Sequence, residues 1–122
     1  MQFSQIHHGS LIVSDLTRAA NFYVEVLGLQ EIDIPTTFPS AGIHVRWFQI
    51  GQQQLHLLQD STPNAPSRRH IALQVDDAQS ARDQLQAKGI AIKETVPIPG
   101  ADRFFLHDPD GNRLEIIEWQ EG

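Results

Sequence analysis

The sequence contains no cysteine. This absence excludes disulfide frameworks, thiolate metal sites and cysteine nucleophiles, and it fits a reducing compartment. No stretch approaches the roughly 18 consecutive apolar residues of a transmembrane helix, and the first residues lack the basic and apolar segments of a secretion signal. We therefore expect a cytoplasmic protein with no membrane partner.

Basic residues are also few. Lys and Arg together number 9 against 15 Asp and Glu, which gives a formal net charge of −6. Nucleic-acid-binding proteins usually gather Lys and Arg on one face, so this balance argues against a nucleic-acid partner. The 122 residues are enough for one domain with a single core and too few for a separate regulatory module.

What the sequence does contain is a segment that occurs twice. His8 is followed seven residues later by Asp15, and His70 is followed seven residues later by Asp77. Each copy then ends in a glycine-led strand with a polar residue between two apolar neighbours, namely His56 in the first copy and Glu115 in the second.

The two copies together offer four candidate metal ligands: His8, His56, His70 and Glu115. Imidazole nitrogens and carboxylate oxygens suit one divalent first-row ion, Zn, Ni, Co, Mn or Fe, and no thiolate competes with them. The equivalent positions in the two copies favour a shared site over four unrelated residues.

Hydrophobic periodicity predicts the same order of elements, β-α-β-β-β, in both copies. In the first copy we expect strands at 6–13, 29–34, 43–50 and 53–59 and a helix from Ser14 or Asp15 to Leu27. In the second copy we expect strands at 70–75, 90–95, 103–107 and 114–119 and a helix at 78–88. The predicted fold class is α+β, with two βαβββ repeats at about 4–60 and 68–120 forming a cupped mixed sheet within a single domain, 1–122.

The alternation of side chains along each strand predicts the face that each candidate occupies. Leu11 and Val13 face the helix of their repeat, which turns His8 to the opposite face. The same parity places His56, His70 and Glu115 on non-helical faces, which would line a shared cup if the two sheets curl toward each other. Trp47 and Phe105 are further candidates to line the cup as substrate-binding residues, although Ile43, Val45 and Trp47 are equally apolar and the opposite assignment stays open.

Four motifs in this order resemble the vicinal oxygen chelate (VOC) superfamily. They are His-x3-Ile-Val-x-Asp-Leu at 8–16, Asn-Phe-Tyr-x3-Leu-Gly-Leu at 21–29, His-Ile-Ala-Leu-x-Val-Asp-Asp at 70–77 and Asp-Pro-Asp-Gly-Asn-x-Leu-Glu-Ile-Ile-Glu at 108–118. This superfamily includes glyoxalase I, methylmalonyl-CoA epimerase, extradiol dioxygenases, fosfomycin-resistance transferases and bleomycin-binding proteins. The resemblance implies metal ligands at the positions of His8, His56, His70 and Glu115, and it implies a homodimer.

The resemblance implies a metal-dependent, glyoxalase-like enzyme, a lyase, isomerase or epimerase acting on a small molecule that chelates the metal through adjacent oxygens. Two alternatives stay open, an extradiol-type dioxygenase and a non-enzymatic drug-binding or resistance protein. Glyoxalase I usually carries glutamate at the position of His56. Fosfomycin-resistance enzymes and extradiol dioxygenases use three positions, matching His8, His70 and Glu115, which would make His56 an extra ligand or a neighbour of the ligands.

The same residues suggest catalytic roles. Resemblance to glyoxalase I implies Glu115 as the base that moves a proton, and His56 is the second choice because a histidine pKa near 6.5 suits the task. Arg103, at one end of the seventh expected strand, is a candidate to hold a substrate carboxylate through a bidentate contact.

Overall fold

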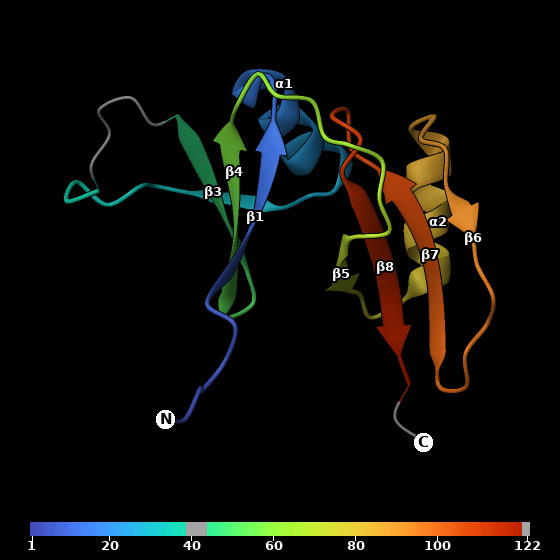
Figure 1. Ribbon diagram of the computed structural model, residues 1–122. Helices are drawn as coiled ribbons and strands as arrows, with labels where there is room; N and C mark the ends of the chain where they lie inside the picture. Colours follow the sequence, from blue (N-terminus) through green and yellow to red (C-terminus); the bar gives the residue numbers. More distant parts are fainter. Residues whose placement is uncertain (39–43, 121–122) are drawn as a thin grey trace. The chain divides into compact units, whose positions relative to one another are not determined.

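The computed structural model describes residues 1–38 and 44–120. The chain forms two compact units, Met1–Asn64 and Ala65–Gly122 (Figure 1). Each unit contains one four-stranded mixed sheet, as the repeated βαβββ pattern predicts. The two repeats are described separately below.

Unit 1 has the sheet order β1-β4-β3-β2. Strand β1 runs parallel to β4, and the remaining neighbours are antiparallel. Its strands are β1 (His8–Val13), β2 (Gln30–Ile32), β3 (Val45–Ile50) and β4 (Gln53–Gln59). The strand expected from residue 43 is described from Val45, and Ile43 itself lies outside the described residues.

The helix of unit 1 begins where the sequence predicts and then changes its winding. The side chain of Asp15 caps α1 (Leu16–Asn21) by accepting a hydrogen bond from the backbone N–H of Arg18. The prediction of one regular helix as far as Leu27 was wrong, because 22–26 forms a π-helical segment, η1 (Phe22–Val26). The N–H of Leu27 bonds to the carbonyl of Phe22, five residues back, so the turn is wider than an α-turn.

The wider turn lets two adjacent aromatic residues enter the core. Phe22 and Tyr23 are both buried, and their rings meet edge to face at 5.3 Å. In a regular α-helix adjacent residues point about 100° apart, so one of them would turn further from the sheet.

Unit 2 repeats this arrangement with the sheet order β5-β8-β7-β6. Its elements are β5 (His70–Gln74), α2 (Ala78–Ala87), β6 (Lys93–Glu94), β7 (Ala101–His107) and β8 (Arg113–Trp119). Strand β6 has two residues instead of the six predicted. Among the described residues it pairs with β7 alone, as an edge strand, and Pro97 follows closely, which limits the length of backbone that can join the ladder.

Arg82 ties α2 to the sheet of unit 2. Its guanidinium donates to both carboxylate oxygens of Glu94 and of Asp102 at 2.7–3.1 Å, and it lies 5.0 Å from the centroid of the Phe104 ring. The hydrogen bonds from Arg82 lower the pKa of the Asp102 carboxyl. Helix α2 therefore covers the face of the sheet that carries Phe104, and the buried residues Leu106, Leu114 and Ile116 share that parity.

A tight turn positions the strand that carries Glu115. The buried carboxylate of Asp108 accepts hydrogen bonds from the backbone N–H groups of Asp110 and Asn112, and Gly111 has a φ of 80°, which favours glycine. The Asp-Pro-Asp-Gly segment at 108–111 thus forms the turn that its sequence predicts. None of the helices within residues 1–38 and 44–120 is long and apolar enough to cross a membrane.

Candidate functional site

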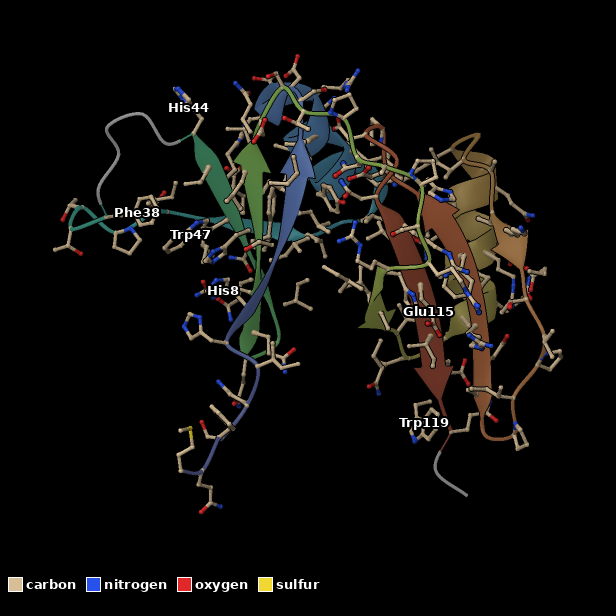
Figure 2. The ribbon with its side chains drawn as sticks, viewed as in Figure 1. His8, Phe38, His44, Trp47, Glu115 and Trp119 are labelled. Carbon is tan, nitrogen blue, oxygen red and sulfur yellow. The ribbon has the colours of Figure 1, made fainter. Side chains whose placement is uncertain are left out.

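On the face of the unit 1 sheet opposite α1, three rings form a stack, and Figure 2 labels the two outer ones, His8 and Trp47. His56 in β4 pairs with Trp47 in β3 and with Ser10 in β1, and His8 lies two residues before Ser10 on the same face. The His56 ring lies 4.1 Å from the Trp47 ring at an interplanar angle of 2° and 4.1 Å from the His8 ring at 14°. The strand register therefore places His56 between Trp47 and His8.

This stack keeps His56 in its neutral form. Only 7% of His56 is exposed, and burial lowers its pKa to about 4, with further lowering by positive charge on His8 and His7. Its Nε2 lies 2.8 Å from the side-chain oxygen of Gln54. With that oxygen as acceptor, Nε2 carries the proton and Nδ1 keeps the lone pair.

The stacked geometry does not let His8 and His56 bind one ion together. An imidazole binds a metal in the plane of its ring, about 2.0–2.1 Å from the nitrogen. Two nearly parallel rings 4.1 Å apart have lone pairs that run side by side instead of converging. One ring must turn, and His8 is the one with more freedom, because it is exposed and stacks in parallel on one ring, whereas His56 stacks between two rings.

His7 touches His8 although the sequence analysis left it out. The Nδ1 atoms of the two rings are 2.9 Å apart, and the rings meet edge to face at 5.2 Å. Strand β1 begins at His8, so the alternation rule does not extend to His7. Gln54 was also missed, although it lies two residues before His56 and therefore shares its face.

The pKa of His56 leads to a testable pH dependence of stability. The pKa is about 4 in the folded protein and near 6.5 in the unfolded chain, so the unfolded chain binds the proton more tightly. The stabilisation is complete above about pH 6.5 and is lost as the pH falls toward 4, at a cost of up to about 3 kcal/mol. Urea unfolding of metal-free protein at pH 7 and pH 4 should show this loss in the wild type and in His44→Phe, whereas His56→Phe should lack most of it. An equal loss in all three proteins would contradict the assignment.

Unit 2 holds His70 and Glu115 in direct contact. Glu115 in β8 pairs with Ala72 in β5, which places His70 two residues away on the same face. The Nε2 of His70 lies 2.9 Å from Oε1 of Glu115, and its Nδ1 lies 3.0 Å from the backbone carbonyl oxygen of Arg68. Only 6% of Glu115 is exposed.

This pair has the geometry of two ligands of one ion. Both nitrogens of His70 face oxygens, and if Nδ1 donates to the carbonyl of Arg68, the lone pair of Nε2 points toward the Glu115 carboxylate, where the two groups can share a metal ion. Two ligand atoms that each lie about 2.1 Å from an ion, at an angle near 90°, are about 3 Å apart. Donation from Nδ1 to a backbone carbonyl is also the support that metal-binding histidines commonly have. The residues present therefore fit a divalent ion, although no group of three His, Cys, Asp or Glu side chains gathers for it among residues 1–38 and 44–120.

Arg103 contacts Glu115 of this pair, and Phe105 contacts His70. The Nη1 of Arg103 lies 3.5 Å from Oε2 of Glu115, and the His70 ring meets the Phe105 ring edge to face at 5.1 Å. Arg113, which the sequence analysis missed, places its guanidinium carbon 3.8 Å from the Phe105 centroid. It lies two residues before Glu115 in β8, so the alternation that selected Glu115 also predicts its face.

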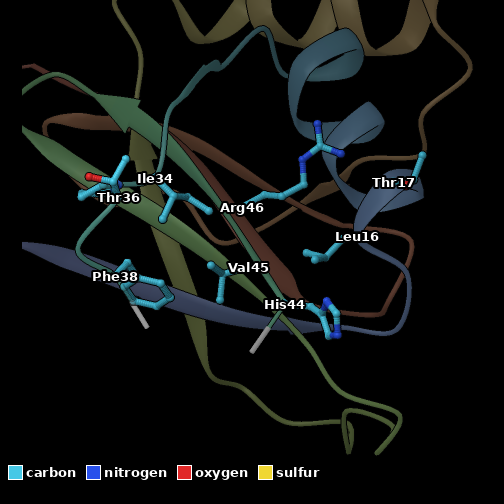
Figure 3. Close-up of a pocket in the computed structure, with 9 residues that line it drawn as sticks. Leu16, Thr17, Ile34, Thr36, Phe38, His44, Val45 and Arg46 are labelled. Atoms are coloured by element: carbon cyan, nitrogen blue, oxygen red, sulfur yellow. The ribbon is translucent and has the colours of Figure 1, made fainter. Parts of the chain in front are cut away.

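A separate pocket of about 540 Å³ lies in unit 1 (Figure 3). It is formed by the start of α1, the segment after β2 and the start of β3. None of the residues selected from the sequence lines it. The lining residues are Leu16, Thr17, Ile34, Pro35, Thr36, Phe38, His44, Val45 and Arg46.

Comparison with known sequences identifies a family. A family model described as the glyoxalase/bleomycin resistance protein/dioxygenase superfamily matches residues 5–116. The chain is 29% identical over 122 residues to a lactoylglutathione lyase of Escherichia coli O157:H7, a match that spans 91% of this chain and 90% of that enzyme.

Solved structures share the fold. A protein of Bacillus anthracis assigned to the glyoxalase family superimposes with a TM-score of 0.88 at 27% identity, covering 98% of each chain. TnmS3, an antibiotic-binding protein from Streptomyces sp. CB03234, gives a TM-score of 0.75 at 26% identity, covering 98% of this chain and 99% of its own. The fosfomycin resistance protein FosX of Listeria monocytogenes, solved with Mn(II), gives 0.80 at 20% identity, covering 98% and 95%, and shows the fold alone.

Proposed function

The chain belongs to the glyoxalase/bleomycin resistance protein/dioxygenase superfamily, and from this premise we propose that it is a divalent-metal-dependent, glyoxalase-like enzyme. It would act as a lyase, isomerase or epimerase on a small substrate that presents adjacent oxygens. The observation that carries the proposal is the contact of 2.9 Å between His70 and Glu115, with the second His70 nitrogen bonded to a backbone carbonyl. Relatives of this family act on small molecules of different kinds, as the lactoylglutathione lyase and the antibiotic-binding protein illustrate.

The proposed ligands are His70, Glu115 and His8, with His56 as a fourth ligand or as the ring that orients His8. The stack on Trp47 and the hydrogen bond to Gln54 support the orienting role of His56. When bound, the ion would act as a Lewis acid on the substrate oxygens.

Glu115 is the proposed general base. Its Oε1 faces His70 and its Oε2 faces Arg103, so one oxygen can take a proton from the carbon next to the chelating oxygens and return it. His56 is less suited than the sequence indicates, because its pKa of about 4 makes it a weak base. Arg103 would hold a negative group of the substrate, and Trp47 and Phe105 remain the candidates for apolar contact with the substrate.

A homodimer is part of the same proposal. Phe3 and Ile6 near the N-terminus expose 85% and 70% of their surface. Contact with a second chain would remove these apolar side chains from water, which favours association.

Two alternatives have specific support. If His56 is not a ligand, the remaining set is two histidines and one carboxylate, the set that non-heme Fe(II) oxygenases use, which supports an extradiol-type dioxygenase. The 26% identity to an antibiotic-binding protein supports a binding protein without catalysis.

Turnover assays separate these functions. Protein loaded in turn with Zn, Ni, Co, Mn and Fe(II) should be assayed against hemithioacetals and α-hydroxycarbonyl compounds by absorbance, and against catechols by oxygen uptake. We expect turnover without oxygen uptake, a fall to below about 1% after chelation, and recovery on adding one equivalent of metal. Oxygen uptake with Fe(II) alone would establish the dioxygenase instead. No turnover with any metal would leave a binding protein.

A further inference from the structure

Two arginines flank one aromatic ring on the open face of the unit 2 sheet. Phe105 in β7 pairs with Glu115 in β8. Arg103 lies two residues before Phe105, and Arg113 is paired with the residue two positions after it, so the three side chains share a face. The guanidinium carbons of Arg103 and Arg113 lie 5.8 Å and 3.8 Å from the Phe105 centroid.

The two guanidinium groups have N–H donors beyond those used in the hydrogen bonds described here. Arg113 donates to the backbone carbonyl of Arg68, and Arg103 donates to the carbonyl of Val96, and neither carbonyl carries a charge that would neutralise the guanidinium. The contact from Arg103 to Glu115 is 3.5 Å, longer than a strong charged hydrogen bond. The buried Nε of Arg103 has no hydrogen-bond partner among the described residues.

The local charge is opposite to that of the whole protein. The cluster of Arg103, Arg113, Phe105 and Glu115 contains two guanidiniums and one carboxylate, and metal binding would engage that carboxylate. The full chain carries a formal charge of −6. The positive electrostatic potential around this cluster favours negatively charged ligands, although the protein as a whole is acidic.

The geometry points to an oxyanion site: we propose that Arg103 and Arg113, supported by Phe105, bind a negatively charged group of the substrate, a carboxylate or a phosphate-type group. This inference rests on the proposed function, and it adds Arg113 and the substrate class to it. The substrate would carry chelating oxygens at the His70–Glu115 pair and a separate oxyanion at the arginines. Guanidinium groups bind both kinds of oxyanion bidentately.

The test measures anion binding apart from metal binding. Inorganic phosphate, acetate and, as a neutral control, acetamide are titrated into the full-length protein and followed by NMR, including the arginine Nε–H signals. Each titration is done with metal-loaded protein and with chelator-treated protein. We expect shifts at Arg103, Arg113 and Phe105 with phosphate or acetate in both preparations and none with acetamide. Binding that disappears when the metal is removed would place the anion on the ion and overturn the inference.

Three variants make the assignment specific. Arg113→Gln and Arg103→Gln should each weaken anion binding by about tenfold or more, while Arg46→Gln, which removes an arginine paired with Glu31 in unit 1, should leave it unchanged. Arg113→Lys keeps the charge without the fork and should give an intermediate affinity. Equal weakening in Arg103→Gln, Arg113→Gln and Arg46→Gln would show that anion binding depends only on the net charge of the protein. That result would contradict a specific site at Arg103 and Arg113.

The outcome is distinguishable from failure of the proposed function. Metal content is measured on every variant, and it should remain at the wild-type level in Arg113→Gln, whose side chain is not a proposed ligand. If the chain binds anions but takes up no metal, the oxyanion site is supported and the proposed metal-dependent enzyme is contradicted. The relative affinities for phosphate and acetate identify the class of oxyanion, and an affinity for neither would overturn the inference.

Discussion

Replacing Glu115 by glutamine is expected to weaken divalent-metal binding by at least about 100-fold. Glutamine has nearly the same shape, so the fold is kept, but the neutral amide cannot supply the charge that offsets the ion. The side chain is 6% exposed and lies 2.9 Å from His70, so little solvent can take over its role. Competition against a metal-indicator dye measures the affinity directly.

The matched control for this variant is Glu31→Gln, which removes a carboxylate paired with Arg46 in unit 1. It should leave metal affinity within about twofold of the wild type, because exposed ion pairs contribute little beyond their own surroundings. If Glu115→Gln also bound metal with wild-type affinity, the His70–Glu115 contact would be structural and the proposed ligand set would be wrong.

The second large effect separates His8 from His56. His8→Ala is expected to weaken metal binding by about 100-fold, because it removes the ring that can turn toward an ion. His56→Phe keeps a flat ring against Trp47 and is expected to weaken binding by less than about tenfold. The reason is that His56 is covered on both faces and bonded to Gln54, so ligation would require it to leave the stack.

The opposite order of effects would contradict this reading. A loss in His56→Phe as large as that in His8→Ala would make His56 a true fourth ligand and would favour the set of three histidines and one carboxylate over the smaller set. Thermal unfolding of both variants separates ligation from damage to the fold, since a ligand variant loses metal while its metal-free form keeps wild-type stability.

Strand parity accounts for much of what the sequence predicts about each unit. Alternation along β1 and β4 is enough to put His8 and His56 on one face, and the observed register joins them there. The bounds of β4 match the expected 53–59 because a glycine turn and a polar residue limit that strand on either side. The alternation of side chains depends only on the strand itself, so the face of each residue can be predicted without knowledge of the rest of the chain.

Contacts between side chains were not predictable in the same way. The parallel stacking of His56 between Trp47 and His8 depends on rotamers and on the register of three strands, and neither is encoded in alternation. The low pKa of His56 follows from that stack, so the sequence indicated a better base than the structure contains. The change of winding at Phe22 was hidden as well, because 3.6-residue periodicity assumes a regular helix.

Arg113 shows a different kind of omission. Its parity with Glu115 was available from the sequence, but an arginine in a strand usually indicates solvent exposure, and its position over Phe105 appears only in three dimensions.

The metal content of the protein tests the central claim most directly. Untagged protein purified without chelator, and the same protein after incubation with each first-row metal and desalting, should be analysed by inductively coupled plasma mass spectrometry beside a His70→Ala/Glu115→Gln double variant. The account predicts about one divalent ion per wild-type chain and less than about 0.1 in the variant. Wild-type protein that retains no metal after every reconstitution, or a variant that retains as much as the wild type, would contradict it.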